Sequence, residues 1–168
     1  MATKHLALMF LPLWAMFLFY KISGKRRIKL VSGILSVALV TAFILIAPFF
    51  FWNTQAFIAD TVSYISAGGL RNYPIRGFGF TTILLGLGWL QNSLSYYPTW
   101  LFQGLFGVPI LIWMNKRLKR EPSLRVMMEG FCLLMITTMY FSRFFVESYL
   151  GVFLEFVALT YFLHDVDA

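Results

Sequence analysis

Three arginines stand where the sequence could hold a phosphate group. Arg71 and Arg76 lie in a stretch rich in glycine and other turn-forming residues at 70–79, and Arg143 lies between the last two apolar runs. A guanidinium presents a planar fork of donors that matches the oxygens of a phosphate. We therefore expect Arg71, Arg76 and Arg143 to bind a lipid phosphate headgroup. The alternative is that they are ordinary solvated or lipid-anchoring side chains.

Carboxylates accompany these arginines. Glu147 follows Arg143 by four residues and Glu155 follows Glu147 by eight, which places the three on one face of a helix. A charge inside an apolar run is costly in hydrocarbon, so we expect Glu155 to face the bundle or a water-filled cavity. Its alternative role is a buried hydrogen bond between helices. Asp60 is a further candidate for orienting ligands, and its alternative is a place on the wet face of an amphipathic helix.

Other chemistry finds little support in the residues. His5 and His164 stand alone near the two ends of the chain, so no metal site is expected. The one cysteine, Cys132, lies inside an apolar run and cannot form an intrachain disulfide. We assign no catalytic residue, because the sequence has no nucleophile elbow and no triad, and we expect no cofactor. Glu129 is expected to form an interfacial ion pair with Arg125.

The composition indicates the solvent in which these residues must act. Of 168 residues, 60% are hydrophobic and 12% are charged, about half the charged fraction of an ordinary soluble domain. Lipid is therefore the expected surrounding. The net charge of +7 comes from basic residues beside apolar runs, which indicates contact with anionic lipid and excludes nucleic acid as the expected partner.

We expect an all-α fold, a polytopic transmembrane helical bundle forming a single membrane domain over residues 1–168. Five spanning helices and one re-entrant or half-buried helix are predicted from apolar runs of about 20 residues. The spanning helices are expected at residues 6–22, 30–52, 99–114, 126–141 and 144–163, the re-entrant helix at 80–90, and an interfacial amphipathic helix at 53–67.

Two basic clusters fix the expected orientation. One follows the first apolar run at 21–29 and the other spans 116–120, and lysine and arginine favour the cytoplasmic side. An even number of crossings must then separate the clusters, which is why residues 80–90 are expected to return to the outer side. The alternative is that the second cluster breaks the orientation rule. Aromatic residues expected to anchor the membrane interface are Trp52, Tyr73, Tyr96, Tyr97 and Trp100.

The chain also resembles a known superfamily. Its motifs are APFFFWNTQAFIADTVSY at 47–64, YPIRGFG at 73–79 and SRFFVESYLGVFLE at 142–155. These are similar to the C-terminal half of bacterial polytopic GT-C glycosyltransferases, including mannosyltransferase-like membrane proteins. The similarity covers about residues 30–165 and rests on the residue character of the loops and helices in these motifs.

The resemblance implies an integral, multi-pass protein of a bacterial plasma membrane that binds a polyprenyl-phosphate sugar. The acidic motif that such enzymes carry in their first outer loop is missing, since no acidic residue precedes Lys29. We therefore expect the carrier-binding half of a transferase, as a fragment or a non-catalytic relative. The alternative is a non-enzymatic small subunit of a larger membrane complex, which would pair with a partner membrane subunit.

Overall fold

The computed structural model describes residues 3–24, 27–63 and 74–163, apart from the side chains of residues 3–8, 62 and 63. The described chain is all-α, with one pair of two-residue strands. In chain order the elements are α1 (Thr3–Lys21), α2 (Arg27–Trp52), α3 (Thr54–Ile58), the π-helical turn η1 (Ala59–Ser63), β1 (Arg76–Gly77), α5 (Phe80–Gly86), α6 (Thr99–Arg120), α7 (Leu124–Tyr140), β2 (Phe144–Phe145) and α8 (Glu147–Phe162).

The expectation of five membrane-spanning helices is wrong. Among the described residues, α2 is the one helix that is long and apolar enough to cross a bilayer. Helices α7 and α8 have 17 and 16 residues, and at about 1.5 Å per residue both are shorter than the roughly 30 Å hydrocarbon core. Helix α6 has 22 residues, but three basic residues occupy its last turn. The apolar stretch found in α1, Met9–Lys21, is also short.

Three other predicted boundaries change. The helix expected at 80–90 ends at Gly86, because Gly88 takes a left-handed backbone with φ of 76° and the chain turns there. The helix expected from residue 144 begins at Glu147, since Phe144 and Phe145 form β2. The helix expected at 53–67 is present as α3 followed by η1 as far as Ser63, and the remainder lies outside the described residues.

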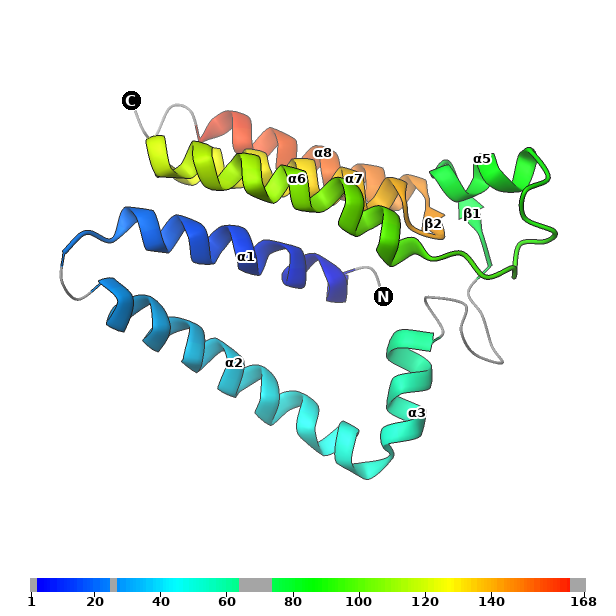
Figure 1. Cartoon of the computed structure of the whole chain (residues 1–168), viewed down its shortest axis with the longest axis horizontal. Helices are drawn as coiled ribbons and strands as arrows, with labels where there is room; N and C mark the ends of the chain where they lie inside the picture. The colour runs from blue at the N-terminus through cyan, green and yellow to red at the C-terminus, as the bar shows by residue number, and fades with distance from the viewer. Residues whose placement is uncertain (1–2, 25–26, 64–73, 164–168) are drawn as a thin grey trace.

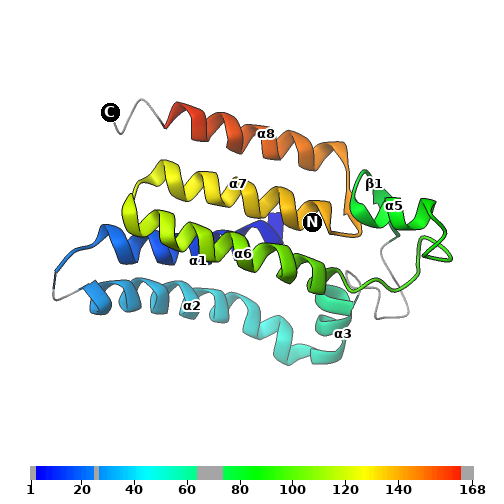
Figure 2. The same cartoon turned by 45° about the horizontal axis from the view of Figure 1, so that its top comes forward.

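Helix α7 forms the centre of the bundle. It packs between α6 and α8, and α1 lies against both α6 and α7 (Figures 1 and 2). The core is rich in methionine, whose flexible side chain fills irregular space. Met114 and Met135 are fully buried, as is Leu13 of α1. A side chain at Gly130 would collide with Met114, so this glycine lets α6 and α7 approach closely.

Helix α2 stands apart from this bundle. It has 26 residues, and only 6% of its most apolar stretch is buried. Val31, near its start, is its one buried residue, and from there α2 diverges from α1 toward its far end (Figure 1). A long apolar helix that its own chain does not cover needs lipid or another helix around it.

A small cap closes the end of the bundle opposite the α1–α2 connection. Strand β1 pairs in parallel with β2, with Arg76 opposite Phe144 and Gly77 opposite Phe145. Gly77 has a φ of 94°, and a Cβ atom there would collide with the backbone carbonyl of Phe145. The strands therefore pair closely only because residue 77 is glycine.

We predict that Gly77→Ala destabilises the protein far more than Gly88→Ala. Both positions have positive φ, which costs an alanine about 1–2 kcal/mol, but a Cβ at Gly88 meets open space. The collision at Gly77 should add about 1–3 kcal/mol. Denaturant unfolding of the two variants in detergent measures the difference. Equal losses would show that the β1–β2 contact does not depend on the missing side chain.

Candidate functional site

The structure brings two of the three predicted phosphate-binding arginines into the cap. The backbone N–H of Arg76 donates to the carbonyl oxygen of Arg143 at 3.0 Å, so the two residues are neighbours across the strand pair. Their side chains differ, because Arg76 is exposed and Arg143 is only 1% exposed. Arg71 lies outside the described residues.

The Arg143 guanidinium is bound to backbone. Its Nη1 donates to the carbonyl oxygen of Ser95 at 2.6 Å, and its Nη2 donates to that of Ser93 at 3.0 Å. Burial lowers the pKa of this guanidinium, and the two carbonyl dipoles offset part of the cost of burying the charge. Arg143 therefore acts as a clamp on residues 87–98, which we call the cap loop.

A second set of hydrogen bonds holds the backbone around Ser93 and around Arg143. The Ile75 N–H donates to the Ser93 carbonyl at 2.8 Å, so this oxygen accepts from two directions. Thr81 Oγ1 donates to the Ser142 carbonyl at 2.8 Å, which ties α5 to the residue before Arg143. The Ser142 hydroxyl lies 2.7 Å from the carbonyls of Met139 and Phe144. These bonds fix the backbone from which Arg143 projects.

Sequence reasoning did not select Thr81, Ser93, Ser95 or Ser142. A lone serine or threonine beside apolar residues carries no sequence signal for such a role. The binding groups at Ser93 and Ser95 are moreover backbone carbonyls, which every residue has. Of the residues in this hydrogen-bonded group, only Arg143 could be selected from the sequence, because its partners lie 48 and 50 residues away along the chain.

An aromatic cluster supports the cap from the bundle side. The rings of Phe106 and Phe141 stack with centroids 4.5 Å apart, and those of Tyr97 and Phe102 stack at 5.2 Å. Phe80 of α5 contacts both Phe102 and Phe141. The end of the cap loop is therefore packed against α6 and α7 on a rigid aromatic base.

Tyr97 is not the exposed interface anchor that was predicted. It is 2% exposed, and its hydroxyl has no hydrogen-bond partner among the described residues. Burial raises the pKa of this hydroxyl from its ordinary value to about 12. The other predicted anchors within the described residues, Trp52, Tyr96 and Trp100, are exposed, while Tyr73 lies outside those residues.

The three predicted carboxylates do not converge on the arginines. Asp60 is exposed on η1, and Glu147 and Glu155 are both exposed on α8. The helical stripe that would join Arg143 to Glu147 does not form, because α8 starts at Glu147. Glu147 lies instead in the first turn of α8, where a negative charge is favourable at a helix N-terminus. Glu155 does not face the interior of the chain.

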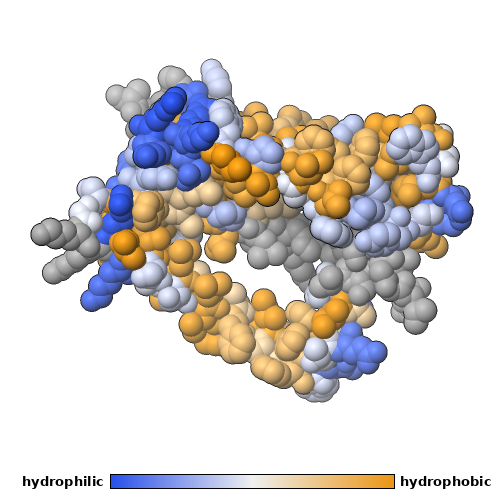
Figure 3. Space-filling view, in the orientation of Figure 1, coloured by the Kyte–Doolittle hydropathy of each residue, from blue (hydrophilic) through white to orange (hydrophobic). Residues whose placement is uncertain are grey.

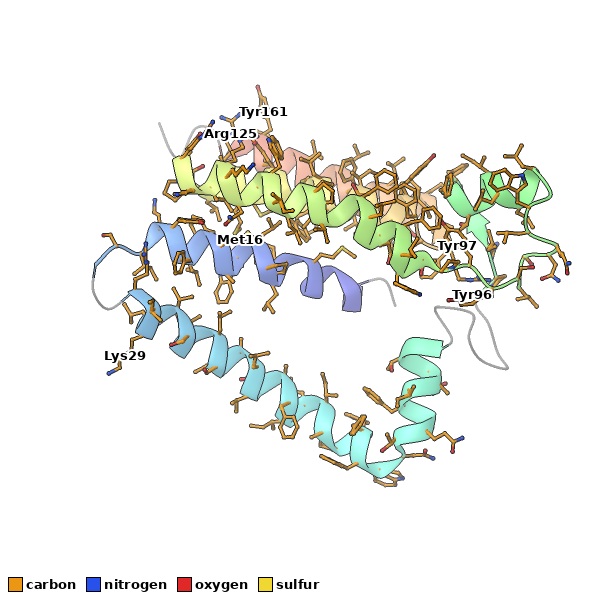
Figure 4. The ribbon with its side chains drawn as sticks, viewed as in Figure 1. Met16, Lys29, Tyr96, Tyr97, Arg125 and Tyr161 are labelled. Carbon is orange, nitrogen blue, oxygen red and sulfur yellow. The ribbon has the colours of Figure 1, made fainter. Side chains whose placement is uncertain are left out.

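The opposite end of the bundle carries the basic clusters. Lys29 of α2 and Arg125 of α7 lie at this end, away from Tyr96 and Tyr97 (Figure 4). Hydrophilic surface gathers here, and apolar surface covers much of the length between the ends (Figure 3). The described residues of the first cluster, 21–24 and 27–29, thus lie at the same end as residues 116–120. Such an end suits anionic headgroups.

The predicted pair between Glu129 and Arg125 is confirmed. Arg125 Nε lies 3.1 Å from one oxygen of the Glu129 carboxylate, and Arg117 Nη2 lies 2.7 Å from the other. The pair joins the end of α6 to the start of α7. The three side chains are partly exposed, so the contribution to stability is about 1 kcal/mol or less.

Metal chemistry has no cluster of ligands in the described part of the chain. No group of three or more histidine, cysteine, aspartate or glutamate side chains lies together there. Cys132 is buried in α7, with its sulfur 3.6 Å from the Thr160 hydroxyl. This contact joins α7 to α8 and has a packing role.

We predict that Arg143→Gln lowers the free energy of unfolding by about 3 kcal/mol, because two hydrogen bonds from a charged donor are lost inside the protein. Arg76→Gln is the matched control and should change stability by less than about 0.5 kcal/mol, since its side chain is exposed. Denaturant unfolding in detergent, with limited proteolysis of residues 87–98, measures both. A cap loop equally resistant in the two variants would contradict the clamp.

Comparisons with protein-family models, with curated proteins and with solved structures find no match to this chain. The similarity to GT-C glycosyltransferases therefore rests on the sequence motifs alone.

Proposed function

We propose that this chain is a small membrane-anchored subunit in which α2 crosses the bilayer and the bundle packs against an apolar helix of a partner membrane protein. The observation that carries the proposal is the exposure of α2, which has 26 residues and is almost uncovered by its own chain. No charged residue follows Lys29 within this helix. The core of a water-soluble protein would bury such a helix.

The partner surface that we assign is one face of α6. Leu101, Leu105, Val108 and Ile112 are spaced by three or four residues and are all exposed, so they form one apolar stripe. Gly104 lies beside them, and a Cβ atom there would meet nothing within 4 Å. In membranes, a small residue within such a stripe lets a second helix approach closely.

The carrier-binding function has less support from the geometry. It requires arginine side chains that can reach a phosphate, and the Arg143 guanidinium is buried on two carbonyls. Arg76 is exposed, but one guanidinium is a weak site for a lipid phosphate when the guanidinium of Arg143 cannot also bind it. The exposed carboxylates on α8 would repel a phosphate and do not support such a site.

The membrane role of α2 is tested by placing a charge at its centre. Val40→Arg should shift the chain from the membrane fraction to an extractable one, because a central arginine costs about 2.5–3.5 kcal/mol of insertion free energy. Ile28→Arg is the matched control, since residue 28 is an exposed apolar position beside the basic cluster. Alkaline extraction of membranes measures both. If Val40→Arg stays in the membrane as firmly as Ile28→Arg, α2 does not span.

The partner is tested by native mass spectrometry of the chain extracted from membranes in mild detergent. We expect a complex of fixed stoichiometry that is lost in Gly104→Leu, because the new side chain would hold the partner helix away. Gly151→Leu is the matched control, since Gly151 is an equally open helical glycine on α8, across α7 from α6. A stable monomer of the unaltered chain would overturn the subunit role.

A further inference from the structure

The cap loop is an irregular segment with an apolar surface. Residues 87–98 contain no charged residue, and the segment projects beyond α5 at the end of the molecule (Figures 1 and 2). Trp89 is 77% exposed, and Leu87, Leu94 and Tyr96 are each more than half exposed. Apolar side chains on a loop in water would ordinarily fold back toward the core.

Many backbone groups of this loop have hydrogen-bond partners within the protein. The N–H groups of Leu87, Gly88 and Trp89 donate to carbonyls of α5 at 2.9 to 3.1 Å. The Asn92 side chain accepts from the Leu94 N–H at 2.9 Å, and the Asn92 N–H donates to the Ser95 hydroxyl at 3.1 Å. The Arg143 guanidinium serves the carbonyls of Ser93 and Ser95.

This combination matches a lipid environment. Backbone outside a helix is tolerated near hydrocarbon only where its polar groups are satisfied within the protein. Tryptophan and tyrosine favour the headgroup region of a bilayer.

The position of the loop agrees with this environment. It lies at the end of the molecule opposite the basic clusters, and α2 also runs away from those clusters, although its far end stands apart from the cap (Figure 1). Trp52, the last residue of α2, is 91% exposed. Trp100, at the start of α6, adds a third exposed indole at this end. These aromatic residues would form a belt at the bilayer surface where α2 emerges.

We propose that the cap loop inserts Leu87, Trp89 and Leu94 into the headgroup region of the phospholipid bilayer, and that Arg143 is the positioning residue that holds the loop in the inserting shape. The inference rests on the proposed crossing of the membrane by α2. It goes beyond that role by giving the chain a second lipid contact, at the surface, built from a loop.

The test uses the purified full chain reconstituted in phosphatidylcholine vesicles. Cys132→Ser removes the one natural thiol, and a polarity-sensitive fluorophore is attached to a new cysteine at Trp89, at Leu39 in α2, or at Lys119 in the basic end. Acrylamide measures access from water, and phosphatidylcholine with a headgroup nitroxide measures contact with the surface of the bilayer. Lys119 serves as the water-exposed reference.

We expect acrylamide quenching at Trp89→Cys to be about threefold weaker than at Lys119→Cys, with strong quenching by the headgroup nitroxide. Leu39→Cys should be protected from acrylamide and reached poorly by the headgroup nitroxide.

Three outcomes would contradict the proposals. If acrylamide quenches the label at Trp89→Cys as strongly as that at Lys119→Cys while Leu39→Cys is protected, the loop inference alone is overturned. An unprotected Leu39→Cys would overturn the crossing by α2. Protection at Trp89→Cys without nitroxide quenching would mean that protein covers the loop, and this also overturns the inference.

The role of Arg143 has a separate readout. Arg143→Lys keeps the charge but cannot bridge two carbonyls with one planar fork, so the label at Trp89→Cys should lose most of its protection while that at Leu39→Cys does not change. Unchanged protection at both sites would remove Arg143 from the proposal. Should Arg143→Lys fail to fold, a label at Leu87→Cys in the otherwise unaltered chain still tests the insertion.

Discussion

The cap depends on one buried cation. The Arg143 guanidinium is removed from water and meets the carbonyl oxygens of Ser93 and Ser95. Burying a charge is costly unless it is hydrogen bonded, so the cap loop must adopt the shape that presents these oxygens. The residues before and after Arg143 are fixed in turn, by Thr81 on one side and by the strand pair on the other. The guanidinium thus holds the cap loop, while the backbone on either side of Arg143 joins α5 and β1 to the end of α7.

The same interaction changes the meaning of the arginine in the sequence. An arginine in an apolar region suggests a ligand, because an unpaired charge would be expensive there. In this chain the charge is offset by the protein's own backbone, which leaves no fork open to a phosphate. The hydrogen bonds that the buried guanidinium requires hold the cap loop in shape, and they do not form a ligand-binding site. That loop has hydrogen-bonded backbone groups at several positions and exposed apolar side chains, which is the reverse of an ordinary surface loop.

The sequence was sufficient for features that depend on composition along one element. Helix α2 was expected at 30–52 and is found at Arg27–Trp52, because an uninterrupted apolar run needs no information about its neighbours. The pair between Glu129 and Arg125 was also predicted, since its partners are four residues apart on one helix.

The sequence was insufficient where the outcome depended on distant partners. Nothing local shows that the chain leaves helix at Phe144 to pair with Arg76, 68 positions earlier. The break removed the stripe expected from Arg143 to Glu155 and shortened the last helix below the length of a bilayer span. The fate of Tyr97 has the same origin, because stacking on Phe102 draws its ring inward while Tyr96 stays exposed.

The molecule meets its surroundings in two different ways along its length. At one end the cations of α1, α2, α6 and α7 can remain hydrated or meet anionic headgroups, and one carboxylate links two of them. At the other end the charge of Arg143 is buried in the cap, and the cap loop presents uncharged apolar side chains beside the exposed Arg76 and Glu147. The end with the basic clusters is therefore strongly polar. The cap loop at the other end carries no charge, and the buried cation beneath it is hydrogen bonded to backbone carbonyls. In the crossing that we propose, such an asymmetry would favour one direction of α2, because reversing it would place cations and uncharged aromatic residues each in the less favourable position.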